Sequence, residues 1–325
     1  MECPKCGTKI EIGDRFCEEC GASLVASKSI VTGGCAKCGA GVEAIDSEGY
    51  CSSCGFRSEV REGDYFEVIV EASFAGVCDR GLKRHRNEDY LACAKVDGGN
   101  TYVIVVCDGV SSSESPDLAA KAAAEAACQS LTMVLARNPQ TLLPTAEREV
   151  VMKNAIASAL KSVCAIPYTN RSDDPPSTTI VAAIVQERSA TIGWMGDSRA
   201  YWISAQASQQ LTTDHSWLND VVASGTMTEI EARKSPNAHA ISRWVGGDIP
   251  DDLEPSIIQF NSPGAGYLLL CTDGLWNYAP QPQQLAALVT STIDIDALGV
   301  SRRLVEFARG KGGGDNITVA VLSVV

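Results

Sequence analysis

Cysteine spacing divides this chain into two parts that must fold by different means. Eight of its fourteen cysteines lie within the first 54 residues, where they form four Cys-x-x-Cys pairs. The other six are scattered through apolar segments, as expected of buried thiols in a reducing compartment. A segment this short cannot build an adequate apolar core, so we expect metal binding to supply most of its folding free energy.

The four pairs form two sets of four thiolates. Each pair is followed by glycine, which is expected to leave backbone N–H groups free to point at the sulfurs, and two such turns give the tetrahedral set that structural zinc prefers. The repeat resembles the zinc-ribbon family, which implies one zinc ion per set. The sets are Cys3, Cys6, Cys17 and Cys20, and Cys35, Cys38, Cys51 and Cys54. A redox pair is disfavoured, because redox Cys-x-x-Cys occurs singly on a helix of a larger fold.

Composition along the chain predicts the domain organisation. Small and polar residues separate the two cysteine sets, and a charged stretch without periodicity follows the second set. We therefore expect a first ribbon over residues 1–24, a linker over 25–34, a second ribbon over 35–57, a linker over 58–67 and one large domain over 68–325.

The charge of the chain limits its partners. The net charge is −13, and residues 1–70 hold seven Lys or Arg against twelve Asp or Glu. Phosphate backbones attract proteins rich in Lys and Arg, so a nucleic-acid partner is unlikely and a protein partner for the ribbons is favoured. No apolar run approaches the roughly 20 residues needed to span a bilayer, so we expect no membrane association and a cytoplasmic location.

In the large domain, acidic residues recur beside glycine, arginine or another acid. They occur in five segments: residues 84–89, 107–109, 196–199, 272–274 and 314–316. Two of these segments follow the strongly apolar runs Tyr102–Cys107 and Tyr267–Cys271. Carboxylates that converge from separate strand ends are the ligands of hard divalent cations, and all-oxygen ligation favours Mn²⁺ or Mg²⁺ over zinc. The pattern predicts a catalytic metal site.

Hydrophobic periodicity predicts clusters of strands separated by pairs of helices. Successive strands without intervening helices indicate antiparallel pairing, so a doubly wound parallel sheet is unlikely. The expected strands are Phe66–Phe74, Tyr90–Lys95, Tyr102–Cys107, Thr178–Val185, Ala190–Met195, Ala200–Ser204 and Ile317–Val324. The expected helices are Pro116–Arg137, Pro144–Cys164, Pro282–Ser291 and Asp296–Ala308.

Six ordered motifs carry a family resemblance over about residues 68–325. They are Arg-x-x-Asn-Glu-Asp at 84–89, Asp-Gly at 108, Gly-Asp-Ser-Arg at 196, Leu-Thr-x-Asp-His-Ser at 211, Thr-Asp-Gly-Leu-Trp at 272 and Gly-Asp-Asn at 314. Their order and spacing resemble the metal-dependent protein serine/threonine phosphatases, the PPM or type 2C family. The resemblance implies an α-β-β-α sandwich of two antiparallel sheets flanked by helix pairs, with two metal ions at one edge. It also implies hydrolysis of phosphoserine and phosphothreonine in proteins by a bridging hydroxide.

The resemblance also implies roles for individual residues. Asp108 bridges both Mn²⁺ or Mg²⁺ ions, and Asp89 holds waters bound to them. Asp273 and Asp315 bind one ion, and Glu88 and the carbonyl of Gly109 bind the other. Arg84 is the phosphate clamp, because its planar guanidinium suits bidentate contact with a phosphoryl group.

Three positions depart from the family pattern or leave a choice open. Asp174 lies where relatives bind a third, weaker metal, and a solvated loop aspartate is the equal alternative. Asn277 replaces an acid that relatives often place four residues after the Asp-Gly aspartate, which weakens the case for a third ion. Val110 replaces a histidine that could protonate the leaving oxygen in some relatives.

Other polar residues of these motifs are expected to be structural. A buried salt bridge between Asp197 and Arg199 is favoured over catalytic roles for them, and His215 is expected to support the entry to a flap over about residues 216–240. The main alternative function is a catalytically silent phosphatase fold that acts as a scaffold, with the ribbons mediating protein interaction. Retention of all five acids in the predicted metal site argues against it.

Overall fold

The computed structural model describes residues 35, 38–45, 50–55, 63–96, 98–169, 174–247, 254–290 and 296–324. The chain separates into two compact units, residues 1–60 and 61–325. In the smaller unit the described residues include one short 3₁₀ helix, Val42–Ala44. Among the described helices, none combines the length and apolar character that crossing a bilayer requires.

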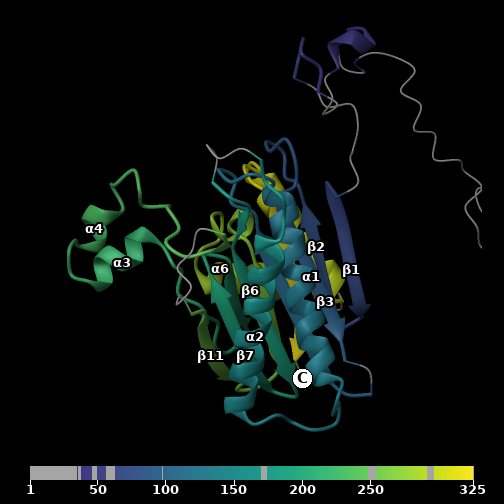
Figure 1. Cartoon of the computed structure of the whole chain (residues 1–325), viewed down its shortest axis with the longest axis vertical. Coiled ribbons are helices and arrows are strands. Elements are labelled where there is room, and N and C mark those ends of the chain that lie inside the picture. Colours follow the sequence, from purple (N-terminus) through teal and green to yellow (C-terminus); the bar gives the residue numbers. More distant parts are fainter. Residues whose placement is uncertain are drawn as a thin grey trace, which may run out of the picture. The chain divides into compact units, whose positions relative to one another are not determined.

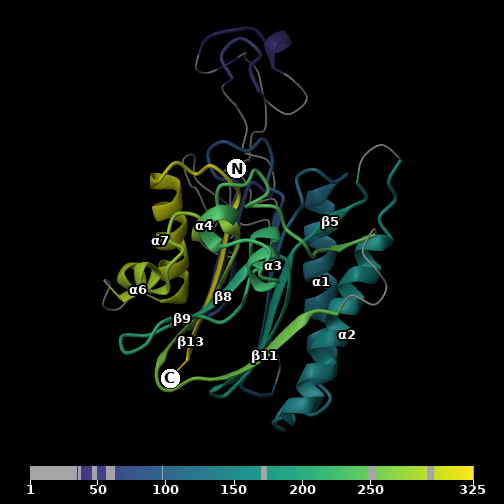
Figure 2. The same cartoon turned by 90° about the vertical axis from the view of Figure 1, so that its left-hand side faces the viewer.

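The larger unit contains two antiparallel sheets (Figures 1 and 2). In spatial order, the first sheet consists of β1 (Tyr65–Glu71), β2 (Phe74–Asp79), β13 (Ile317–Val324), β12 (Gly266–Cys271), β8 (Arg199–Ile203) and β9 (Gln209–Gln210). The second consists of β11 (Ser256–Asn261), β7 (Ser189–Met195), β6 (Ile180–Gln186), β4 (Thr101–Asp108) and β3 (Asp89–Lys95). The short strands β5 (Ser177–Thr178) and β10 (Val245–Gly246) form a separate pair.

Helix pairs cover the outer faces of the two sheets, as Figure 2 shows. The second sheet carries α1 (Pro116–Leu135) and α2 (Thr145–Cys164), and the first carries α6 (Pro282–Thr290) and α7 (Ala297–Gly310). Three shorter helices, α3 (Trp217–Ala223), α4 (Glu229–Ala232) and α5 (Asp273–Trp276), lie in the connections. The predicted α-β-β-α sandwich is confirmed.

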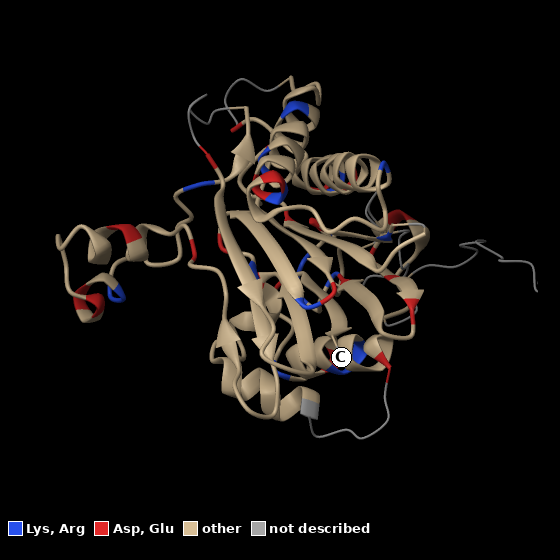
Figure 3. Ribbon diagram, turned by 90° about the horizontal axis from the view of Figure 1, so that it is seen from below, with Lys and Arg blue, Asp and Glu red and all other residues tan. Residues whose placement is uncertain are grey.

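Alternation along the central strands explains why the unit has three apolar layers. In β4, Val103 and Val105 pack under α1 and α2, whereas Ile104 and Val106 point toward the other sheet. In β13, Val319 faces α7 while its neighbours join the layer between the sheets. Because both faces of these strands are buried, apolar residues occupy most of their positions, and Figure 3 shows few charged positions along the middle of the sheets.

The structure corrects the predicted strands in three places. The expected strand Phe66–Phe74 is the hairpin of β1 and β2, which turns between Glu71 and Phe74. The alternation of apolar residues at every second position continues through the turn, so the pattern gave no sign of a break. β1 also begins at Tyr65, so residues 65–67 belong to the sheet and not to the expected linker. Strand β11 was not predicted; it is a half-buried edge strand paired with β7 alone.

The segment predicted as a flap leaves the sandwich and returns at neighbouring points. Ser216 and Ile241 form an isolated antiparallel bridge, and the Trp217 N–H donates to the Ala240 carbonyl at 2.9 Å. Helices α3 and α4 lie between these points and project from the sheets in Figure 1. Among the described residues of α3 no side chain is fully buried, so local hydrogen bonds rather than a core hold this helix.

Candidate active site and metal centres

The predicted acids gather at one edge of the sandwich, where strands of both sheets end. Asp89 begins β3 and Asp108 ends β4, and the two face each other in register. Asp273 begins α5 directly after β12, and Asp315 lies two residues before β13. Because β12 and β13 are neighbours in the first sheet and β3 and β4 in the second, both sheets contribute carboxylates to this edge.

Threonines of the first sheet hold the Asp89 carboxylate. The hydroxyls of Thr272 and Thr318 both donate to Asp89 Oδ2, each at 2.8 Å. The Thr318 N–H in turn donates to the Thr272 hydroxyl at 3.0 Å. Asp89 Oδ1 is buried and has no hydrogen-bond partner within the described part of the chain. One oxygen is therefore fixed and the other is available to a cation or water.

Asn316 ties the loop before β3 to the start of β13. Its side-chain amide donates to the carbonyls of Arg80 and Arg86 at 2.8 and 2.9 Å, and its Oδ1 accepts from the Glu88 N–H at 2.8 Å. The Gly109 N–H donates to the Glu88 carbonyl at 2.9 Å. Glu88 is thereby held between the Asp-Gly turn of one sheet and the Gly-Asp-Asn turn of the other.

Close backbone approach explains the glycine in each Asp-Gly pair. A Cβ at Gly109 would lie 2.4 Å from the Pro116 carbonyl oxygen, and one at Gly274 would lie 1.8 Å from the Asn316 carbonyl oxygen. Real side chains do not tolerate such distances, so these turns require glycine.

Burial and mutual repulsion make the carboxylates costly to keep charged in the absence of cations. Burial, followed by repulsion from Asp89 and Asp273, raises the pKa of Asp108 well above its ordinary value. Burial likewise raises the pKa of Asp273 strongly and that of Asp89 to about 7, although the two threonines counteract the shift at Asp89. Nearby positive charge would relieve this repulsion.

The donor set fits hard divalent cations. All of its side-chain donors are oxygens, and the buried Oδ1 atoms of both Asp89 and Asp273 have no hydrogen-bond partner among the described residues. In the described chain, no three of these residues have carboxylate oxygens that all lie within 4.8 Å of one another. The Sγ atoms of the four cysteines of the second ribbon do lie within that distance. A wider spacing is expected where two ions about 4 Å apart share one ligand set.

Arg84 lies at the rim of the carboxylate cluster. Its Nη2 donates to Asp315 Oδ2 at 2.5 Å and its Nη1 to the Ser111 hydroxyl at 3.3 Å. Its side chain is 38% exposed, so a phosphoryl group can reach the guanidinium from solvent.

The two positions considered for a third metal differ in surroundings. Asp174 is exposed and bridges to Ser113 through the backbone, next to residues 170–173, which lie outside the described chain. Asn277 Nδ2 donates to Asp273 Oδ2 at 3.1 Å, where an acid would present a second carboxylate.

The expected salt bridge between Asp197 and Arg199 is wrong. Arg199 forms a bidentate pair with Asp214, at 2.8 and 2.6 Å, and stacks at 3.7 Å over the ring of Trp276. Burial raises the pKa of Asp197 to about 7, with repulsion from Asp214 as the next cause. The carboxylate of Asp197 therefore adds to the negative potential of the cluster, since it also raises the pKa values of Asp108 and Asp273.

His215 is a packing residue of the flap entry. Its Nδ1 accepts from the Gly196 N–H at 3.2 Å, which leaves the ring proton on Nε2, 2.9 Å from the Ser256 hydroxyl. The ring stacks on Trp194 with centroids 5.9 Å apart, and burial lowers its pKa to about 4.

Sequence reasoning missed four residues that support the acids: Thr272, Thr318, Asn316 and Ser111. Thr272 and Asn316 lay within quoted motifs, so their positions beside ligand candidates were a usable signal. Thr318 lies in an apolar strand, and its inward hydroxyl could not be distinguished from ordinary strand alternation. Ser111 is one of three consecutive serines that sequence alone does not distinguish.

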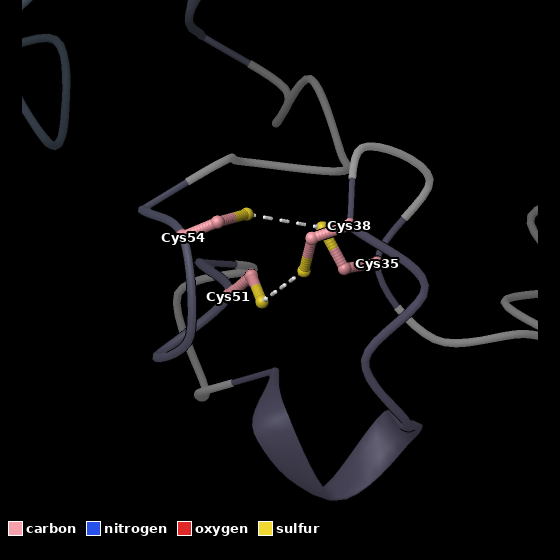
Figure 4. Close-up of side chains that lie close together, drawn as sticks. All are labelled: Cys35, Cys38, Cys51 and Cys54. Atoms are coloured by element: carbon pink, nitrogen blue, oxygen red, sulfur yellow. Dashed lines mark hydrogen bonds between the residues drawn. The ribbon is translucent and has the colours of Figure 1, made fainter.

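The second cysteine set forms a compact sulfur cluster (Figure 4). The sulfurs of Cys35 and Cys54 are 3.5 Å apart and those of Cys38 and Cys51 are 3.6 Å apart, and all four lie within 4.8 Å of one another. Zinc with sulfurs at about 2.3 Å needs sulfur separations of about 3.8 Å, so the cluster fits zinc. The described cysteines all carry free thiols, which excludes disulfides in this cluster.

Each turn of this cluster depends on its glycine. Gly39 and Gly55 have φ angles of +73° and +69°, the left-handed region that glycine adopts without strain. Their N–H groups donate to the carbonyls of Cys35 and Cys51, at 2.8 and 2.7 Å, and so close the turns. The first set, Cys3 to Cys20, lies outside the described residues.

Comparisons with known proteins agree with this geometry. A family model described as Protein phosphatase 2C matches residues 83–307, and one described as Double zinc ribbon matches residues 3–55. The serine/threonine phosphatase stp of Listeria monocytogenes is 27% identical over 244 residues, which are 75% of this chain and 92% of that protein. Protein phosphatase PhpP of Streptococcus pneumoniae is 34% identical over 147 residues, 45% of this chain and 58% of PhpP.

Solved structures show the same fold. The serine/threonine phosphatase Stp1 from Staphylococcus aureus has 25% identity and a TM-score of 0.66, with 82% of this chain and 99% of Stp1 covered. The PPM Ser-Thr phosphatase MsPP from Mycobacterium smegmatis, in complex with cacodylate, has 26% identity and a TM-score of 0.60, with 79% of this chain and all of MsPP covered. Since the phosphatase family model spans more than two thirds of the chain, this protein belongs to the protein phosphatase 2C family.

Proposed function

We propose that this protein hydrolyses phosphoserine and phosphothreonine in other proteins, with Mn²⁺ or Mg²⁺ held at the carboxylate edge of the sandwich. One observation carries the proposal: both sheets deliver buried carboxylates to one edge, where two of their oxygens lack partners among the described residues and Arg84 lies at the rim. Keeping these buried carboxylates charged costs free energy unless cations neutralise them, and hydrolysis of a phosphate ester uses such cations.

The roles proposed for the ligands follow their places in the fold. Asp108 would contact both ions, because its carboxylate lies close enough to those of Asp89, Asp273 and Asp315 to be repelled by all three. Asp273 and Asp315, which come from the first sheet, would hold one ion. Glu88 and the Gly109 carbonyl would hold the other, and Asp89 would orient water beside them. Asp174 is proposed to contribute to a third, more weakly bound ion.

When bound, the two ions would supply a hydroxide nucleophile at neutral pH and positive charge near the phosphoryl oxygens. The side chains then have separate tasks. Arg84 binds phosphoryl oxygens through the planar fork of its guanidinium. The carboxylates fix where the ions sit, and Thr272 and Thr318 fix Asp89. Val110 has no proton to give, so a leaving alkoxide takes its proton from water.

A pocket beside the acids offers space for the substrate chain. Its volume is about 450 Å³, and its lining includes Asp273, Trp276, Arg233 and His239. Arg233 and His239 belong to the excursion that carries α3 and α4, whereas Asp273 belongs to the carboxylate edge. We propose that residues next to the phosphorylated side chain bind here.

The zinc ribbons are proposed to dock a protein partner, because their acidic charge disfavours nucleic acid. We propose that the protein resides in the cytoplasm. Reducing conditions there keep thiols such as those of Cys35, Cys38, Cys51 and Cys54 available to zinc.

Hydrolysis of a phosphothreonine peptide, followed by phosphate release with and without Mn²⁺, tests the proposal. We expect the wild-type chain to turn over the peptide only when Mn²⁺ is present. The Asp273→Asn variant should show no turnover, although its melting temperature should equal that of wild type. Absence of turnover by the wild-type chain under saturating Mn²⁺ would favour the silent scaffold. Turnover by Asp273→Asn equal to wild type would overturn the metal assignment.

A further inference from the structure

Ser111 connects the rim arginine to the carboxylate cluster. Its hydroxyl donates to Glu88 Oε2 at 2.5 Å and accepts from Arg84 Nη1 at 3.3 Å. A hydroxyl has one donor and two acceptor positions, so it can make both contacts at once. The other arm of the Arg84 guanidinium binds Asp315 at 2.5 Å. An unbroken path of hydrogen bonds thus runs from Glu88 through Ser111 and Arg84 to Asp315.

This path fixes the orientation of the guanidinium. The bond to Asp315 restrains one terminal nitrogen of the guanidinium, in a side chain that is 38% exposed. The contact with Ser111 restrains the other terminal nitrogen, so the two contacts together define the plane of the group. A planar fork binds a phosphoryl group with two parallel hydrogen bonds only when its plane is aligned with the oxygens.

The neighbouring serines are placed differently, although all three occur in a row. Ser113 is buried, and its hydroxyl accepts from the Ser177 N–H at 3.2 Å, so it supports the fold. Ser112 is exposed, and no side-chain hydrogen bond is found for it in the described part of the chain. Ser111 alone of the three contacts Arg84 and Glu88.

We propose that Ser111 is a positioning residue that orients Arg84 for the phosphoryl group through its bond to Glu88. The proposal rests on the proposed phosphatase function. It assigns Ser111 a part in phosphate affinity, and no direct contact with the reacting atoms. Because Arg84 binds phosphate in the substrate and in the product alike, losing its alignment should weaken both complexes and leave the chemical step nearly unchanged.

The test compares Ser111→Ala with Ser112→Ala in the full-length, zinc-loaded chain at saturating Mn²⁺. Turnover of p-nitrophenyl phosphate gives kcat and KM, and inhibition by inorganic phosphate gives its inhibition constant. For Ser111→Ala we expect KM and the phosphate inhibition constant each to rise about tenfold, equivalent to about 1.4 kcal/mol, with kcat changed less than threefold. Ser112→Ala should match wild type, and Ser111→Thr, which keeps the hydroxyl, should recover most of the loss.

A coupling measurement excludes an indirect effect. In an Arg84→Lys background, Ser111→Ala should cause no further loss of phosphate affinity, because the fork that it aligns is gone. If Ser111→Ala does not fold, Ser111→Gly removes the same hydroxyl and should give the same shift.

The role of Ser111 would be overturned if Ser111→Ala had the same phosphate inhibition constant as wild type. It would also be overturned if Ser111→Ala and Ser112→Ala lost phosphate affinity equally. These outcomes require an active wild-type chain. If the wild-type chain itself shows no Mn²⁺-dependent turnover, the proposed function fails, which distinguishes the two conclusions.

Discussion

The two candidate metal centres of this chain are built in opposite ways. The cysteine cluster takes its ligands from 20 consecutive residues, Cys35 to Cys54, on two tight turns. The carboxylate cluster takes its candidate ligands from positions as distant as Glu88 and Asp315, at or beside the ends of strands in both sheets. Three apolar layers lie behind the carboxylate cluster.

This difference indicates what each metal does for the protein. A segment as short as the cysteine unit is expected to need its ion in order to fold, so zinc would be part of its structure. A sandwich with a complete core positions its carboxylates by strand register and hydrogen bonds before any ion arrives. The ions proposed for this edge would therefore serve chemistry instead of folding, and the stability of the core must offset the repulsion among the acids.

Loss of one thiolate should have the largest effect on stability. Structural zinc contributes about 10–16 kcal/mol to the folding of small zinc peptides, so Cys51→Ser should unfold the second ribbon and release its zinc. The melting transition of the larger unit should stay within about 1 °C of wild type, because the apolar clusters described for that unit contain none of the four cysteines. Zinc content by mass spectrometry and calorimetry together check this. An unchanged zinc content would contradict a four-thiolate site.

Neutralising the central carboxylate should have the largest effect on catalysis. Asp108→Asn keeps the shape of the side chain and removes the proposed bridging ligand, so kcat should fall on the order of 10³-fold. The metal-free variant should melt no lower than wild type, because one repelling charge has gone. Steady-state kinetics and thermal melts of the same sample check both points. A collapse of the fold would show that Asp108 is structural.

Loosening Asp89 should affect metal affinity next. Thr318→Val removes one of two hydroxyls that hold Asp89 Oδ2. Loss of a residue that orients a metal-site side chain typically costs 10–100-fold in affinity, so half-maximal activation should need roughly that much more Mn²⁺. Thr318→Ser keeps the hydroxyl and serves as the control. Equal activation curves for the two variants would show that the hydroxyl does not act through Asp89.

The acid cluster should also give the metal-free protein a pH dependence of its own. Burial is the largest cause that raises the pKa values of Asp89 and Asp197 to about 7 from the ordinary 3.8. Folded values above the unfolded ones mean that this stability is fully present below about pH 4 and is lost as pH rises through 7.

With a chelator present, we therefore expect the melting temperature of the larger unit to fall between pH 5 and 8, at about 2–4 °C for each kcal/mol lost. His215 has the opposite sign, since its pKa is lowered to about 4 and its contribution is lost as pH falls. Asp197→Asn should flatten the fall, and saturating Mn²⁺ should abolish it. A chelated protein that gains stability toward pH 8 would contradict the repulsion.

The smallest effect is expected at Asn277, which replaces an acid that relatives often have. Asn277→Asp places a carboxylate beside Asp273, where the amide now donates at 3.1 Å. A third Mn²⁺ should then bind a few-fold more tightly, by roughly 1 kcal/mol of added Coulomb attraction. Titration of Mn²⁺ by calorimetry, with Asn277→Ser as the control, measures the change. Weaker binding in Asn277→Asp would remove Asp273 from any third site.

The sequence was informative where local chemistry decides the structure. Cysteine spacing identified the thiolate set, and the apolar runs before Asp108 and Asp273 predicted strands that end at acids. Prediction failed where contacts between distant residues decide. The pairing of Arg199 with Asp214 instead of Asp197 depends on how a turn folds against Trp276.

The supporting hydroxyls are a second example. Thr318 reaches Asp89 only because the two sheets pack face to face at this edge, and 229 residues separate the pair in the chain. Local patterns therefore predict which residue types could bind metal, and the tertiary fold decides which groups orient them.

The central claim is that the carboxylate edge binds two catalytic ions and the cysteine unit binds none of them. Calorimetric titration of Mn²⁺ into the zinc-loaded chain, with phosphate release from a phosphothreonine peptide measured at each point, tests it directly. Two Mn²⁺ should bind at the larger unit, and turnover should rise as they bind and be absent before. Turnover at full rate without Mn²⁺ or Mg²⁺, or Mn²⁺ binding that survives in Asp108→Asn unchanged, would contradict the claim.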